Sequence, residues 1–401
     1  MQMSSHASHS VSNSASVNVS SVTDAASILA ANKLEVLIER FISQLKRRQV
    51  TGSYNVAIAT CKFLMRVTSI SRWNTAQEFI TLLRLIGKKI TDAQPREFSI
   101  GNIVRRVLAL VRDEVNVKIP STVATSNESN TIAPVNTSMF QLLVTTGKEK
   151  ENNNNNNNNT STTTSTSTHS SKSDLRSIII QGIRDLMDEV QSVHENIELM
   201  TVDLIHDNEI LLTPTPGSST VLNFLLKASL KRKFTVLITE NYPNDIEVCH
   251  GFAKKLANAN IESVIIPDST VFAVMSRVGK VLIGARSVFA NGGCVTAAGV
   301  ATVCECAKEH RTPVFAVAGL YKFSPGYPFD RNSLIEFGNS GKVLPYDDCD
   351  LVGKCEVTNP LYDYVVPEHI DIYITNIGGF SPNFIYRIVL DNYNTEDVDL
   401  S

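Results

Sequence analysis

The first third of the chain repeats its hydrophobic positions with the spacing of an α-helix. Apolar residues at 34, 37, 38, 41 and 45 recur at i, i+3, i+4, i+7 and i+11, which places them on one helical face. The same spacing returns over residues 54–65, 79–90 and 103–111. The pattern predicts four amphipathic helices that pack as a bundle over residues 29–117.

Two stretches lack this periodicity. Residues 1–28 are dominated by Ser, His, Asn and Ala, and residues 118–172 contain a run of asparagine at 152–159 followed by a Thr/Ser tract. Such compositions cannot bury enough apolar surface to fold, so they predict a disordered tail and a disordered insertion. An apolar island at 138–143 inside the insertion is either a docking motif or an isolated helical turn. Helical spacing resumes after it and predicts a connecting helix over 173–207.

The remainder of the chain changes period. From residue 208 to 393, short apolar runs alternate with helical stripes, a pattern typical of βαβ units and a parallel sheet covered on both faces. The expected strands are 210–212, 235–239, 263–266, 281–283, 314–318 and 372–375, and the expected helices are 218–231, 245–258, 296–309 and 383–392. The fold class is therefore α/β, with an N-terminal helical bundle followed by a Rossmann-like parallel-sheet domain and a short tail at 394–401.

The composition of the chain mainly excludes classes of function. With 37 Lys+Arg against 40 Asp+Glu there is no electrostatic reason to bind nucleic acid. No apolar run is long enough to cross a membrane, and the N-terminus lacks the basic start and apolar core of a signal peptide. Seven cysteines without a spaced framework fit reduced thiols and a cytosolic location. The basic run Lys46-Arg47-Arg48 either contacts an acidic partner or complements the dipole of the helix it ends.

Two turns stand where a doubly wound sheet usually binds ligands, at the ends of strands. The first contains Thr215, Gly217 and Ser218, and the second contains Asn291, Gly292 and Gly293. Neither carries the lysine of a P-loop nor a dinucleotide fingerprint. We therefore keep two interpretations open: an anion pocket, vestigial or active, or plain strand-to-helix turns.

Cysteine and histidine pairs are the remaining candidates for chemistry. Cys306 and His310 are spaced i, i+4, with Cys304 nearby, and Cys249 precedes His250. Neither pair has a further ligand pair to complete a metal site, and cysteines on an apolar helical stripe are usually core residues. The sequence therefore predicts no metal and no cofactor.

The segment 280–293, Lys-Val-Leu-Ile-Gly-Ala-Arg-Ser-Val-Phe-Ala-Asn-Gly-Gly, carries a specific resemblance. It is similar to the signature of the family that joins the alpha, beta and delta subunits of initiation factor 2B with two sugar-phosphate isomerases, for methylthioribose 1-phosphate and ribose 1,5-bisphosphate. Features of the beta type occur at 272–278, 375–379 and 384–387, and the resemblance extends into the bundle at 46–50 and 101–106. Only the tail and the Asn-rich insertion lie outside it.

This resemblance implies that the chain is not an enzyme. The isomerases use a cysteine in a T-x-C turn and an aspartate in N-G-D for proton movement, and the matching positions here are Thr215 and Gly293. A threonine hydroxyl titrates far too high to replace a thiol, and glycine has no side chain to move a proton.

The resemblance further implies a regulatory, non-catalytic subunit of the exchange factor that replaces GDP by GTP on translation initiation factor 2. Its expected partners are the alpha, gamma, delta and epsilon subunits in a decamer, in which the epsilon subunit carries the exchange reaction. The chain would scaffold this complex, contact the alpha subunit of initiation factor 2 and help sense its phosphorylation. The alternatives are a sugar-phosphate-binding module and an isomerase of the related enzymes.

Overall fold

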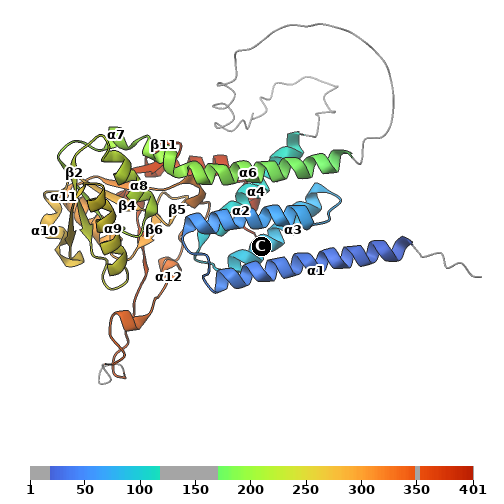
Figure 1. Ribbon diagram of the computed structural model, residues 1–401, viewed down its shortest axis with the longest axis horizontal. Helices are drawn as coiled ribbons and strands as arrows, with labels where there is room; N and C mark the ends of the chain where they lie inside the picture. Colours follow the sequence, from blue (N-terminus) through green and yellow to red (C-terminus); the bar gives the residue numbers. More distant parts are fainter. Residues whose placement is uncertain (1–18, 118–169, 348–352, 401) are drawn as a thin grey trace, which may run out of the picture.

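A computed structural model describes residues 19–117, 170–347 and 353–400 (Figure 1). It consists of long helices beside an α/β domain with a mostly parallel sheet, which confirms the predicted fold class. The apolar island at 138–143 and the asparagine run lie outside the described residues, as do the first 18 residues of the expected tail.

Four helices form the predicted bundle: α1 (Val19–Lys46), α2 (Ser53–Ile70), α3 (Ala76–Ala93) and α4 (Phe98–Val117). Helix α1 begins at Val19, so residues 19–28, expected in the tail, are helical instead. The start of α3 shows why the chain turns there. Thr75 accepts a hydrogen bond from the Glu78 backbone N–H at 3.2 Å, and the Glu78 carboxylate accepts one from the Asn74 N–H at 2.8 Å.

Helix α6 (Ser170–Glu198) belongs to the bundle as well as linking it to the next domain. It packs against α2 and α4, and further along against the α/β domain (Figure 1). Its buried face comprises Ile179, Ile183, Leu186, Val190, Val193 and Ile197. Arg106 on α4 reaches Glu189 on α6 with two hydrogen bonds, at 3.0 and 2.8 Å, which fixes the pairing of the two helices.

The main sheet has seven strands in the order β11-β10-β7-β4-β1-β2-β3, parallel except for β11. The strands are β1 (Glu209–Thr213), β2 (Phe234–Thr239), β3 (Glu262–Ile266), β4 (Lys280–Gly284), β7 (Val314–Val317), β10 (Ile372–Thr375) and β11 (Gly378–Phe380). The helices of this domain are α7 (Thr201–Leu204), α8 (Ser219–Ala228), α9 (Ile246–Asn258), α10 (Val271–Met275), α11 (Val300–His310) and α14 (Ile385–Asn392). The strand order reverses between β1 and β4, where doubly wound folds open a crevice.

A second, smaller sheet was not predicted. Its order is β8-β5-β6-β9, from β5 (Ser287–Phe289), β6 (Cys294–Ala297), β8 (Phe323–Ser324) and β9 (Tyr362–Val365). The helix expected from residue 296 begins only at Val300, because Thr296 lies in β6 and donates a hydrogen bond to the Gly284 carbonyl at 2.9 Å. The turn at 291–293 is therefore a hairpin between two strands and does not precede a helix.

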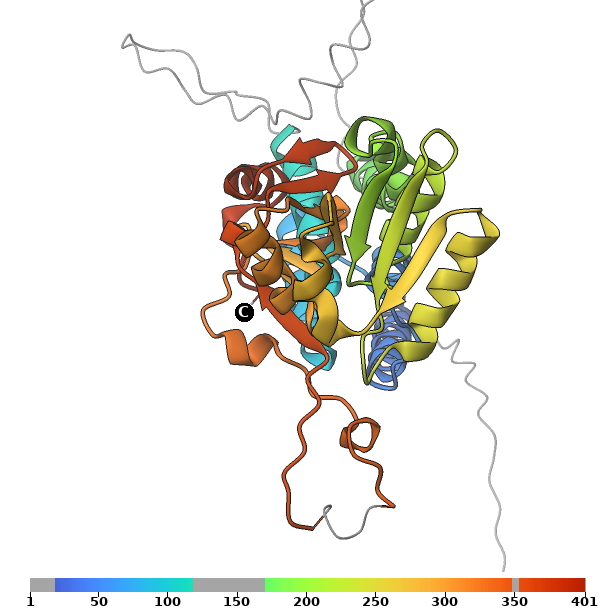
Figure 2. The same cartoon turned by 90° about the vertical axis from the view of Figure 1, so that its left-hand side faces the viewer.

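Two further segments depart from the expected domain. Between β8 and β9, residues 325–347 and 353–361 belong to an arm that projects from the body and includes α12 (Arg331–Leu334) (Figure 2). The end of the chain, expected as a tail, docks on the bundle. Asp397 is fully buried there and accepts two hydrogen bonds from Arg112, at 2.8 and 3.0 Å.

Candidate functional site

The turn after β1 satisfies its own polar groups. Thr215 is buried, and its hydroxyl accepts a hydrogen bond from the Gly284 N–H at 2.9 Å, across the point where the strand order reverses. Ser218 caps α8, because its hydroxyl accepts the Val221 N–H at 3.3 Å. Gly217 lies exposed between them. In this strand-to-helix turn the hydroxyls of Thr215 and Ser218 both accept hydrogen bonds from backbone N–H groups.

The hairpin at 291–293 is equally engaged. The Asn291 amide donates to the Tyr364 hydroxyl at 2.8 Å and accepts from the Gly293 N–H at 3.1 Å. Gly292 has φ +82°, and its carbonyl accepts the Tyr373 hydroxyl at 2.8 Å. A Cβ at Gly293 would collide with the Tyr364 hydroxyl. In this hairpin, the Asn291 side chain, the Gly293 N–H and the Gly292 carbonyl all have hydrogen-bond partners within the protein.

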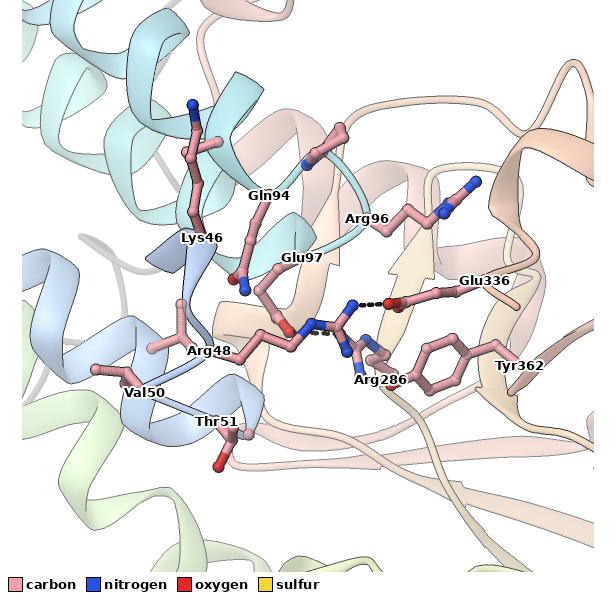
Figure 3. A pocket seen from close by; sticks show the side chains of 14 residues that line it. Lys46, Arg48, Val50, Thr51, Gln94, Arg96, Glu97, Arg286, Glu336 and Tyr362 are labelled. Carbon is pink, nitrogen blue, oxygen red and sulfur yellow. Dashed lines mark hydrogen bonds and ion pairs between the residues drawn. The ribbon is translucent and has the colours of Figure 1, made fainter. Parts of the chain in front are cut away.

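A cavity of about 390 Å³ opens elsewhere, between the bundle and the α/β domain (Figure 3). Its charged lining comes from four parts of the chain: the α1–α2 loop, the α3–α4 loop, the residues after β4, and the root of the arm. The lining residues are Lys46, Arg48, Val50, Thr51, Gly52, Val56, Ala93, Gln94, Pro95, Arg96, Glu97, Arg286, Glu336 and Tyr362. None of the six residues predicted for an anion pocket is among them.

Two ion pairs cross this cavity. Arg286 binds Glu97 at 2.8 Å, and its guanidinium lies 4.2 Å from the ring centroid of Tyr362, whose hydroxyl it also contacts. Arg48 pairs with the buried Glu336 of the arm. The side chains of Lys46 and Arg96 point away from both pairs (Figure 3). The guanidinium groups of Arg48 and Arg286 are therefore each paired with a carboxylate, at the boundary between the two domains.

A buried lysine stands behind the cavity wall. The Lys322 ammonium donates to the Ala285 carbonyl at 2.9 Å, next to Arg286. Burial lowers the pKa of Lys322 to about 8, against a smaller opposing effect of Glu97, which favours the charged form. Lys322 itself does not line the cavity but lies next to it, bonded to the residue before Arg286.

Sequence reasoning found these residues only in part. Arg48 lies in the noted basic run, and Arg286 lies in the segment that carries the family resemblance. Glu97, Glu336 and Tyr362 had no local signal, because each reaches the cavity only through the packing of distant segments.

Three of the cysteines in the α/β domain lie in the core. Cys249, Cys294 and Cys304 are buried free thiols, and burial is the main cause that raises the pKa of Cys294 to about 12. Within residues 19–117, 170–347 and 353–400, no three His, Cys, Asp or Glu side chains gather as metal ligands would. None of the helices in these ranges combines the length and the hydrophobicity of a membrane span.

Comparison with known proteins decides the family. The model of the Initiation factor 2 subunit family matches residues 49–382, which run from just before α2 in the bundle to just after β11 in the main sheet. The chain belongs to this family. Two proteins named translation initiation factor eIF2B subunit beta match it along most of its length. The one from Schizosaccharomyces pombe is 36% identical over 90% of this chain and 97% of that protein. The one from Dictyostelium discoideum is 35% identical over 90% and 96%.

More distant relatives include enzymes. The ribose 1,5-bisphosphate isomerase of Archaeoglobus fulgidus is 30% identical over 55% of this chain and 69% of its own. Among solved structures, a chain of the tetrameric eIF2B-beta2-delta2 complex from C. thermophilum matches with a TM-score of 0.65 and 28% identity, over 92% of this chain and 98% of that chain. Beta subunits of eIF2B thus match nearly from end to end, and the isomerase matches over about half of this chain.

Proposed function

We propose that this chain is a regulatory, non-catalytic subunit, of the beta type, of the exchange factor that replaces GDP by GTP on translation initiation factor 2. The observation that carries the proposal is the end-to-end match with the beta subunit of S. pombe, over 97% of that protein. A match of this extent leaves no separate domain of the relative unaccounted for. Such a match favours a shared function over a similarity of fold alone.

The local chemistry supports the absence of catalysis. An isomerase needs an acid-base pair, and we infer that Thr215 and Gly293 replace the cysteine and aspartate of the related enzymes. The Thr215 hydroxyl accepts a backbone hydrogen bond, and the Tyr364 hydroxyl occupies the space that a side chain at Gly293 would need. Neither position offers a group that takes up and returns a proton.

Exposed apolar side chains support the proposal that the chain is a subunit of a complex. Along β11 and α14, the large apolar side chains of Ile377, Phe384, Tyr386 and Leu390 are exposed. Exposed large apolar side chains that lie close together in the sequence are typical of an interface between subunits. We propose alpha, gamma, delta and epsilon subunits as partners in a cytosolic decamer, with the alpha subunit of initiation factor 2 as the substrate whose phosphorylation the chain helps to sense.

The test is purification of the tagged chain from the cytosol of its own organism, with mass identification of what accompanies it. The purified assembly is then assayed for GDP release from initiation factor 2, with and without phosphate on the alpha subunit of that factor. We expect the other subunits to co-purify and the phosphorylated factor to inhibit release. Recovery of the chain alone, or an assembly without exchange activity, would refute the proposal.

A second candidate, a sugar-phosphate-binding module, draws on the cavity. Four cationic side chains, Lys46, Arg48, Arg96 and Arg286, line a space large enough for a small phosphorylated sugar. Its own carboxylates, Glu97 and Glu336, already neutralise two of them. Thermal melting with millimolar ribose 1,5-bisphosphate tests this candidate, because a ligand that binds the folded state raises the melting temperature. An unchanged Tm would exclude it at that concentration.

A further inference from the structure

The arm between β8 and β9 exposes aromatic side chains to an unusual degree. Phe329 is 94% exposed, more than any other large apolar side chain among the described residues, and Tyr327 lies beside it with ring centroids 6.0 Å apart. Phe337 and Tyr346 further along the arm are 60% and 61% exposed. Beyond α12 the arm projects away from the bundle and the α/β domain (Figures 1 and 2).

The root of the arm is nevertheless fixed in direction. The amides of Asn244 and Asn359 exchange two hydrogen bonds of 2.8 Å, and Asn359 is buried. Lys342 donates to the Asn244 carbonyl at 2.9 Å, and Glu336 pairs with Arg48 of the bundle. An arm held in place before binding loses little conformational entropy when a partner covers it.

The charges of the arm point to a protein partner. Its described part carries the cations Arg331, Lys342 and Lys354 and the carboxylates Asp330, Glu336, Asp347 and Glu356. This mixture gives no field of one sign that would attract nucleic acid or an anionic membrane. Exposed aromatic residues among mixed charges are instead the composition of protein interfaces, where aromatic side chains supply most of the binding energy.

We propose that this arm is a docking arm that binds a delta-type subunit of the same family through Tyr327, Phe329 and Phe337. The choice of partner rests on the proposed function and on the solved beta2-delta2 complex, one chain of which matches this chain over 98% of its own length. The ion pair between Arg48 and Glu336 has a positioning role, since it sets the direction in which the arm leaves the body.

The experiment measures the affinity of the full chain for the delta subunit of its own organism. Phe329→Ala and the double variant Tyr327→Ala/Phe329→Ala are compared with Leu85→Ala, which removes a half-exposed apolar side chain from the outer face of α3. We expect Phe329→Ala to weaken binding on the order of ten-fold and the double variant more. We expect Leu85→Ala to leave binding within about two-fold, and all variants to melt like the wild type.

The positioning role has its own readout. Arg48→Glu and Glu336→Arg are each expected to weaken delta binding several-fold, and the combined charge swap to recover most of the loss. If the wild-type chain binds delta and the aromatic variants bind it equally well, the docking-arm proposal is wrong, and the proposed function is unaffected. Loss of only self-association, or of only initiation factor 2 binding, in those variants would also overturn it. Failure of the wild-type chain to bind any exchange-factor subunit would refute the proposed function itself.

Discussion

The strand-end turns and the interdomain cavity handle their polar groups in opposite ways. At the turns, the hydroxyl of Thr215 and the amide of Asn291 bond to neighbouring protein groups within the α/β domain. At the cavity, Arg48 and Arg286 meet carboxylates that come from other parts of the chain, beside an open space of about 390 Å³. The turns therefore use these groups within one domain, whereas at the cavity two ion pairs join the bundle to the arm and to the α/β domain.

The largest expected effect is that of Gly293→Asp, which introduces at the hairpin the aspartate that we propose the related isomerases carry there. We expect a loss of about 3 kcal/mol or more in the free energy of unfolding, because the new side chain collides with the Tyr364 hydroxyl and places a carboxylate in a buried site. Positive φ is not the reason, since it belongs to Gly292. Urea denaturation measures the loss, with Gly251→Asp as the control.

Gly251 is exposed on α9, and a Cβ at this position would meet no atom within 4 Å, so its replacement should cost little. Equal stability of the two aspartate variants would show that the hairpin has room for a catalytic side chain, and the contrast between the two sites would fail.

The next effect concerns the cavity. Glu97→Ala leaves Arg286 without its ion-pair partner, and we expect a loss of about 2 kcal/mol. This figure lies below that of a fully buried pair, since the Arg286 side chain is one-quarter exposed and partly screened. Asp391→Ala removes a surface i, i+4 pair with Arg387 and should cost well under about 1 kcal/mol. A smaller loss for Glu97→Ala than for Asp391→Ala, by chemical denaturation, would mean that the cavity pair does not join the domains.

The buried Lys322 next to the cavity is expected to make the free energy of unfolding depend on pH. Its pKa falls from 10.5 to about 8 on folding, so between these values the folded state has lost a proton that the unfolded state still holds. Stability from this group therefore rises with pH, by about 1 kcal/mol between pH 8 and pH 9. The difference in unfolding free energy between the wild type and Lys322→Met, measured at both pH values, isolates it. A difference independent of pH would show that the folded lysine keeps its usual pKa.

The parts of this structure that depend on local pattern could be predicted from the sequence. All six expected strands fall in the main sheet, because each is a run of apolar residues flanked by turn residues. The smaller sheet escaped notice, since its strands of two to four residues are too short to show a period. The C-terminal segment has the composition of a polar tail, and its Asp397 is buried because Arg112 on α4 and Arg84 on α3 pair with the carboxylate.

The same division holds at the candidate site. The Thr215 turn and the Asn-Gly-Gly turn can be found in the sequence, because proline and glycine residues mark the end of an apolar run. Glu97 and Glu336 are 239 positions apart in sequence order and meet the arginines only through domain packing. No pattern within a window of residues can reveal such a meeting, so the charged cavity required the structure.

The smallest expected effect is that of Thr215→Ala. The variant loses an acceptor for the buried Gly284 N–H, which costs about 1 kcal/mol when no water replaces it. Exchange-factor assembly and GDP release should stay at wild-type levels, because the Thr215 hydroxyl serves the backbone of the turn and no proton transfer. The matching enzyme assay uses ribose 1,5-bisphosphate and methylthioribose 1-phosphate with the wild-type chain, and we expect turnover at the buffer rate. General acid-base groups each contribute about 10²- to 10⁴-fold, so if Thr215 and Gly293 replace both groups, as we propose, little rate remains. Turnover well above the buffer rate that disappears in Thr215→Ala would instead make the strand-end turn an active site.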